Sequence, residues 1–86
     1  GQHLGQIQQS IADFEEMVAL APQRAEGYEN LGVAYAMMGQ PQQAITFLEQ
    51  ALQRNPNNKQ THANLATAYA AIGNSAKARE HQQLAQ

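Results

Sequence analysis

Apolar residues recur every three or four positions along most of the chain, which is the spacing of a helix with one buried face. The first stretch predicts a helix from Ile7 to about Leu20, with an apolar stripe made of Ile7, Ile11, Phe14, Met17 and Val18. The same spacing predicts four more helices, over residues 25–38, 41–54, about 59–72, and from about 75 onward. The pattern therefore predicts an all-α chain of five helices joined by short turns.

Proline, glycine and asparagine mark the ends of these predicted helices. Pro22 and Pro56 end two of them, because proline disfavours the helical conformation in the residue before it and has no backbone N–H. Gly39 and Gly73 end two others, since glycine readily adopts the left-handed conformation that closes a helix. The residues predicted to cap the helices that follow are Asn57 or Asn58, and Asn74 or Ser75.

A period of 34 residues relates the predicted helices to one another. The residues that recur unchanged 34 positions later are Asn30, Leu31, Ala34, Tyr35, Ala36, Gly39, Ala44 and Ala51. Those that are found unchanged 34 positions earlier are Gly39, Gln40, Gln42, Gln43, Ile45, Glu49 and Pro56. One repeated unit, a pair of helices, therefore accounts for the whole chain.

Residues 25–58 resemble the repeat of the tetratricopeptide repeat (TPR) family. That family carries an aromatic residue, Leu-Gly, Tyr, Ala, a large apolar residue and Pro at fixed spacings within about 34 residues. The matching residues here are Tyr28, Leu31, Gly32, Tyr35, Ala44, Leu48 and Pro56. The second copy departs from the pattern at His62, Ala66 and Gln82. The resemblance implies an alpha-alpha superhelix, a solenoid of antiparallel helices.

In this register the chain forms a single domain with about two and a half repeats. Residues 1–24 make a partial repeat with the second helix only, residues 25–58 a complete repeat, and residues 59–86 a complete helix pair. Gly1 aligns with Tyr35, so the chain is expected to begin with the last turn of a first helix. We interpret it as a fragment of a longer protein.

Small residues are expected where two helices of a repeat approach most closely. They are Gly32, Ala44 and Ala51, with their counterparts Ala66, Ala78 and Ala85. A larger side chain at such a contact would force the helices apart, at a typical cost of about 1 to 3 kcal/mol.

Composition argues against several classes of function. The net charge of −2 and the charged fraction of 14% leave no basic surface for nucleic acid, and no apolar run is long enough to cross a membrane. There is no cysteine to act as a nucleophile or metal ligand. His3, His62 and His81 lack a metal-binding spacing, His62 is expected to be a partly packed ring, and the acidic residues Asp13, Glu15 and Glu16 are expected to be solvated. The sequence thus predicts no catalytic residue, no metal and no cofactor.

The resemblance implies a protein-protein interaction module that binds a peptide segment of a partner in a concave groove lined by the first helix of each pair. The residues expected in that groove are Glu26, Glu29, Asn30, Val33, Met37, Gln60, Ala63, Asn64, Thr67 and Ala71. Asn30 and Asn64 resemble the asparagines with which some members hold the peptide main chain, since an amide offers both a donor and an acceptor. Alternatively, each caps or bridges local backbone.

The expected ligand is neutral or mildly basic, with small apolar side chains facing Val33, Met37 and Ala71. Glu26 and Glu29 would repel an acidic tail. Some members of the family clamp a terminal carboxylate with Lys, Arg and Asn, but Glu29 and Val33 stand at two of those positions here. Only Asn64 matches that clamp.

A structural role is the alternative function. The first predicted helix should expose part of the apolar stripe Leu4, Ile7, Ile11, Phe14 and Val18, because the helix that would cover it is absent. Exposed apolar patches mark association surfaces. The sequence therefore also predicts that the chain stacks on itself or forms a homodimer through this helix.

Overall fold

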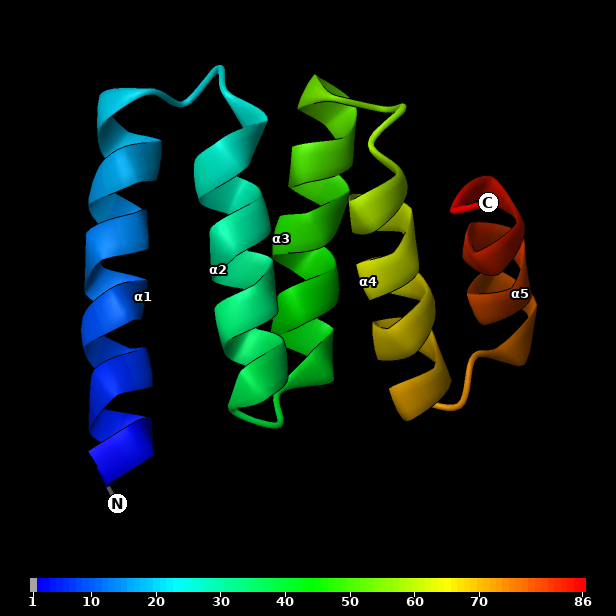
Figure 1. Ribbon diagram of the computed structural model, residues 1–86, viewed down its shortest axis with the longest axis horizontal. Coiled ribbons are helices and arrows are strands. Elements are labelled where there is room, and N and C mark those ends of the chain that lie inside the picture. The colour runs from blue at the N-terminus through cyan, green and yellow to red at the C-terminus, as the bar shows by residue number, and fades with distance from the viewer. Residues whose placement is uncertain (1) are drawn as a thin grey trace.

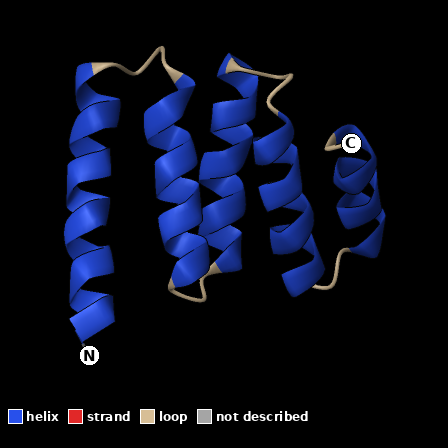
Figure 2. Cartoon of the chain, viewed as in Figure 1, coloured by secondary structure: helices blue, strands red, loops and turns tan. Residues whose placement is uncertain are grey.

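Five antiparallel helices follow one another in a row in the computed structural model, which describes residues 2–86 and, for side chains, residues 4–86. They are α1 (Gln2–Leu20), α2 (Ala25–Met37), α3 (Pro41–Arg54), α4 (Lys59–Ala71) and α5 (Ser75–Leu84). Figure 1 shows them in chain order from one edge of the molecule to the other, with the two termini at opposite edges. Figure 2 shows only helices and short loops over the described residues. The prediction of an all-α superhelix with five helices is confirmed.

The helix ends follow the turn residues in the sequence. Gly39 and Gly73 have φ angles of 75° and 85°, the left-handed conformation that glycine adopts without steric cost. Asn58 caps α4, and its side-chain oxygen accepts a hydrogen bond from the backbone N–H of Gln60. Asn74 caps α5 in the same way. The structure thus selects Asn58 and Asn74 from the two pairs of candidate caps.

α1 differs from the sequence-based expectation at its start. The helix runs without a break from Gln2, whereas a last turn of an earlier helix followed by a loop was expected there. Gly5 aligns with Gly39 in the repeat, yet it lies inside α1. The physical reason is the residue two positions later, where Ile7 replaces Pro41. Proline would disfavour the helical conformation at Gln6, and isoleucine does not.

The core lies between α2, α3 and α4. Ala44, Leu48 and Leu65 are completely buried, and four half-buried residues pack against them, namely Tyr35, Ile45, Leu52 and Tyr69. α2 and α3 approach closely at Gly32, where an added Cβ would lie 2.5 Å from Leu48 Cγ and 3.2 Å from the Ala44 carbonyl oxygen. The expected small-residue contact is therefore present in the complete repeat.

The spacing of Leu65, Tyr69 and Ile72 predicts that all three lie on the inner face of α4, but Ile72 is an exception. Its side chain is 40% exposed, although the spacing from Leu65 and Tyr69 placed it inside. Ile72 is the C-cap residue, so it follows the last helical residue, Ala71.

Candidate functional site

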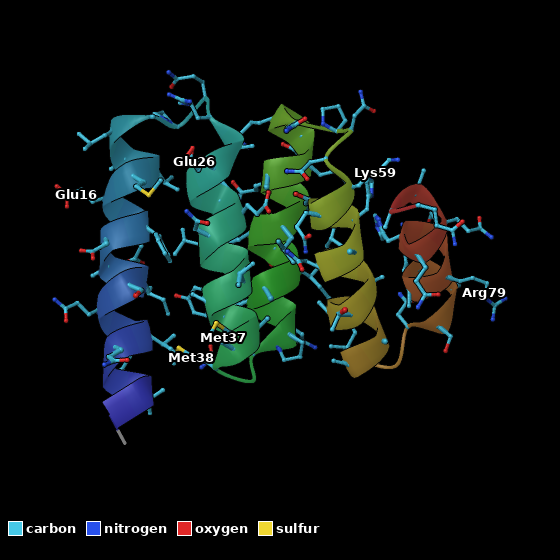
Figure 3. All side chains as sticks on the ribbon, in the orientation of Figure 1. Glu16, Glu26, Met37, Met38, Lys59 and Arg79 are labelled. Carbon is cyan, nitrogen blue, oxygen red and sulfur yellow. The ribbon has the colours of Figure 1, made fainter. Side chains whose placement is uncertain are left out.

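The residues predicted to line a groove lie on α2 and α4, and none of them is buried. Residues three or four positions apart share one face of a helix, so each set forms one stripe along its helix. α2 and α4 contact each other directly and also pack on α3. In Figure 3, Glu26 and Met37 lie toward opposite ends of α2, so the stripe runs along most of this helix.

An open pocket of about 490 Å³ lies between these two stripes. Five of the predicted residues border it, Val33 and Met37 from α2 and Asn64, Thr67 and Ala71 from α4. Leu48 of α3, which is completely buried, also lines the pocket. Met37 is 66% exposed and is thus free to contact another molecule. Most of the pocket surface is apolar, which suits an apolar side chain.

A second hollow, of about 350 Å³, shares Val33 and Met37 with the first pocket. Its other wall comes from α1 and includes Gln6, Ile7, Ser10 and Phe14. Sequence reasoning did not assign Gln6 and Ser10 to a groove. A signal was present, because both polar residues lie within one helical turn of Ile7, on the side of α1 that also carries Phe14.

This hollow also bears on the predicted association stripe of α1. Ile7, Ile11, Phe14 and Val18 are all half-buried, and only Leu4, at 44%, is largely exposed. Val18 packs against α2, since an added Cβ on Gly27 would lie 2.9 Å from its Cγ2. α2 therefore covers much of this stripe, part of which was expected to be exposed.

At the beginning of α2 the surface becomes polar. Glu26, Glu29 and Asn30 border a hollow of about 300 Å³ together with Asn55 and Asn58. The carboxylate of Glu29 is already engaged, because its Oε2 accepts hydrogen bonds from Asn58 Nδ2 at 2.9 Å and Thr61 Oγ1 at 2.8 Å. Glu29 therefore ties α2 to the start of α4 as well as lending negative charge to this end of the groove.

The two asparagines of the stripes differ in their surroundings. Asn64 Oδ1 accepts a hydrogen bond from Gln60 Nε2 at 3.2 Å, and both residues belong to the predicted groove. Asn30 borders two of the hollows. Among the described residues, no hydrogen bond to local backbone occupies either amide. Both side chains are half-buried and border open hollows.

Two histidines that are far apart in the sequence meet on the opposite side of α4. His62 and His81 are each only 6% exposed, and their Nδ1 atoms lie 2.9 Å apart. His62 Nε2 lies 2.9 Å from the Pro56 carbonyl oxygen, to which it must donate. His62 is therefore more deeply packed than expected. The repeat register offered a signal, because His62 and His81 align with the aromatic residues Tyr28 and Phe47.

Burial and hydrogen bonding shift the pKa of two groups around this pair. Burial lowers the pKa of His81, and the neighbouring His62 acts in the same direction. Burial and a 2.7 Å hydrogen bond to Glu49 Oε2 raise the pKa of the Tyr69 hydroxyl to about 12. Among the side chains of residues 4–86, no three metal-ligating groups come together. None of the described helices is both long and apolar enough to cross a bilayer.

Several solved structures share this architecture. The TPR2B domain of yeast Sti1 in complex with pHsp70 is 28% identical, with a TM-score of 0.89 over 94% of this chain and 65% of that one. A structure of MamA is 25% identical, with a TM-score of 0.87 over 93% of this chain and 47% of that one. MamA MSR-1 is 24% identical, with a TM-score of 0.85 over 93% of this chain and 46% of that one. The chain thus spans about half the length of the MamA chains.

Sequence comparison leads to the same family. No curated protein matches the chain at a significant level. Two family models, both described as the tetratricopeptide repeat, match residues 25–58 and residues 47–80. The first range is α2 with α3, and the second runs from α3 through α4 into α5. Since these ranges together cover well over half of the chain, the protein belongs to the tetratricopeptide repeat family.

Proposed function

We propose that the face formed by α2 and α4, with the adjoining side of α1, binds an extended segment of a partner protein. The observation that carries this proposal is the apolar pocket of about 490 Å³ between Val33 and Met37 on one side and Thr67 and Ala71 on the other. A pocket of this volume lies in the range of small-ligand pockets. The role is binding, without catalysis.

The charge of the groove favours a neutral or mildly basic segment. Glu26 is exposed, and Glu29 contributes a second carboxylate at the same end of α2. Like charges across an interface disfavour association, so an acidic tail is a poor ligand. A small apolar side chain placed over Val33, Met37 and Ala71 fits the other end.

Asn30 and Asn64 are the residues we expect to hold the main chain of the segment. An amide side chain donates and accepts, so it pairs with a peptide group whatever side chain that residue carries. In an extended segment the backbone N–H and C=O groups are free to pair with the protein, because they form no hydrogen bonds within a helix. Asn64 borders the apolar pocket, and Asn30 borders the neighbouring hollows.

The TPR2B domain of yeast Sti1 gives independent support for protein binding. Its structure is a complex with pHsp70, and its fold matches 94% of this chain. The likeness supports a protein partner as a class. It does not transfer pHsp70 itself, since Glu29 and Val33 replace the Lys and Asn expected of a carboxylate clamp.

The test is selection of peptides from a random phage-displayed library, followed by NMR mapping of the best binder. The changes in amide chemical shift on peptide binding should be concentrated on Val33, Met37, Thr67 and Ala71. Ala71→Arg should weaken binding by about tenfold or more, because it fills the pocket and repels a basic segment. Ala76→Arg is the matched control, since Ala76 is equally small and exposed but lies on α5. Shifts confined to other helices, or equal losses in both variants, would overturn the proposal.

Self-association through Leu4, Ile7, Ile11, Phe14 and Val18 is the second candidate function. Its support is the exposure of Leu4 at one end of α1. The other four side chains are half-buried against the rest of the fold, which reduces the apolar area available to a second copy. This function stays a prediction, with sedimentation as its own test.

A further inference from the structure

The histidine pair on the far side of α4 occupies a place where the preceding repeat carries ordinary aromatic residues. Tyr35 and Phe47 stack with ring centroids 5.4 Å apart. At the equivalent positions 34 residues later, Tyr69 and His81 stack at 5.6 Å. The second repeat thus keeps the aromatic packing of the first but builds it with a ring that can take up a proton.

Hydrogen bonding fixes how many protons this pair can hold. The Pro56 carbonyl only accepts, so His62 Nε2 carries a proton. The two Nδ1 atoms, 2.9 Å apart, then share one proton between them. One further proton can be placed on His81 Nε2 without breaking that bond. A second would put N–H groups and positive charges face to face, which removes the hydrogen bond and adds repulsion.

The charged surroundings offset one positive charge but not two. Glu49 of α3 faces His81, and its carboxylate already accepts from the Tyr69 hydroxyl of α4. On α5 itself, Glu80 and Lys77 act on His81 in opposite directions and lie 3.9 Å from each other. If both rings were protonated, their two positive charges would therefore lie near only one carboxylate without its own cation, that of Glu49.

α5 depends on this contact because the helix is short and has few buried residues. It has only ten residues, and its buried residues are Ala78 and His81 alone. An isolated helix of fewer than about 12 residues is marginal in water, so α5 relies on docking against α4. Loss of the His81 contact would therefore expose one of the two buried side chains of α5.

We propose that His62 and His81 form a histidine latch, which holds α5 on α4 while the Nδ1 atoms share one proton and releases α5 when both rings are protonated. The buried neutral form of His81 sets the direction of the effect. Because burial lowers the pKa of His81 below its usual value of 6.5, the folded state disfavours even the first added proton. The latch is therefore most stable above that value and weakens as pH falls below it, until the second proton opens it.

Release of α5 would also act on the proposed groove. α4 carries Asn64, Thr67 and Ala71 on one face and His62 with Tyr69 on the opposite face, as their helical spacing requires. Without α5, the second face of α4 loses its support, and the groove residues become less fixed. This consequence rests on the proposed function, whereas the latch itself does not.

Hydrogen exchange of α5 amides, measured by NMR without any peptide, tests the latch. Between about pH 7.5 and about pH 5, protection factors in α5 should fall by about tenfold or more, while those of α2 and α3 stay within a small factor. The matched control is the double variant His62→Tyr with His81→Phe, which copies Tyr28 and Phe47 of the preceding repeat. Its α5 should lose no protection over the same range.

Two results would overturn the latch. One is equal loss of α5 protection in the wild-type chain and the double variant. The other, available even if the variant does not fold, comes from the imidazole C–H shifts of the wild-type chain: both rings fully protonated while α5 stays protected. A peptide found by selection is then titrated at both pH values. A working latch with no peptide binding at either pH would contradict the proposed function alone.

Discussion

The guanidinium of Arg54 lies 3.9 Å from the ring centroid of Tyr28, at the point where α3 ends beside the start of α2. The same group donates from Nε to the Pro22 carbonyl at 2.7 Å and from an Nη atom to the Tyr28 hydroxyl at 3.2 Å. Its other Nη donates to the Gln50 carbonyl at 2.8 Å. One side chain thus joins the α1–α2 loop, α2 and the end of α3.

Arg54→Ala should lower the free energy of unfolding by about 1 to 3 kcal/mol, because charge-assisted hydrogen bonds and a cation–π contact are lost together. Arg54→Lys should be intermediate, since an ammonium keeps the charge but cannot make the same set of bonds. Urea denaturation followed by circular dichroism measures both. An Arg54→Ala chain as stable as the wild type would show that the three hydrogen bonds and the cation–π contact together contribute nothing net.

Gly32 and Gly5 allow opposite predictions for the same substitution. Gly32→Ala should destabilise the chain by about 1 to 3 kcal/mol, because its Cβ would lie 2.5 Å from Leu48 Cγ. Gly5→Ala should stabilise by up to about 1 kcal/mol, because Gly5 lies inside α1 and an added Cβ meets nothing within 4 Å. Thermal unfolding of the two variants and the wild-type chain measures both changes in stability. Equal effects of the two changes would contradict the close approach of α2 and α3.

Asn30→Ala combined with Asn64→Ala should weaken a bound peptide by about 0.5 to 1.5 kcal/mol for each lost hydrogen bond. Helical content should stay unchanged, since neither amide supports local backbone among the described residues. Fluorescence anisotropy with a labelled peptide from the library gives the affinity. Asn57→Ala, at an exposed turn position, is the control. Unchanged affinity in the double variant would remove the two asparagines from the site.

The self-association alternative predicts a dimer that grows with concentration and that Ile11→Glu dissociates, because a charge is placed in the apolar stripe of α1. Sedimentation from low micromolar to near millimolar concentration measures this. Glu16→Gln, at an exposed position of the same helix, should leave the dimer intact. A chain that sediments as a monomer throughout, or a dimer indifferent to Ile11→Glu, counts against association through α1.

Tyr69 gives a prediction at alkaline pH. Its pKa is raised to about 12 by burial and by the hydrogen bond to Glu49. The folded state therefore holds the phenolic proton more tightly, so this contribution to stability is complete below pH 10 and is lost as pH rises toward 12. Unfolding free energies measured across pH 9 to 11, roughly, should fall less steeply in Tyr69→Phe. The same pH dependence in the wild-type chain and in Tyr69→Phe would contradict the raised pKa of Tyr69.

Local sequence signals were sufficient for the helices. Helical spacing of apolar residues, Gly39 and Gly73 in the turns, and Pro41 in the first turn of α3 each act within a few residues, so they can be recognised in sequence. The start of α1 shows the limit of the repeat register. Alignment to Gly39 suggested a turn at Gly5, but the residue that makes the turn in the next unit, Pro41, is Ile7 in the first.

The faces of α2 and α4 were likewise predictable, because spacing alone places Val33 with Met37 and Thr67 with Ala71. That these two pairs border one pocket over Leu48, and that α1 extends it with Gln6 and Ser10, depends on how three helices pack. Helix spacing in sequence carries no information about the angle and distance at which two helices cross.

Local interactions within four residues set which residues are helical, where most turns fall and which side of each helix is apolar, so these features can be recognised in the sequence. Other contacts depend on how the helices pack, namely those of His62 with His81, of Arg54 with Pro22 and Tyr28, and of Glu29 with Thr61. Those partners are 19 to 32 residues apart. Their contacts exist because packing of the helices brings distant side chains within hydrogen-bonding distance.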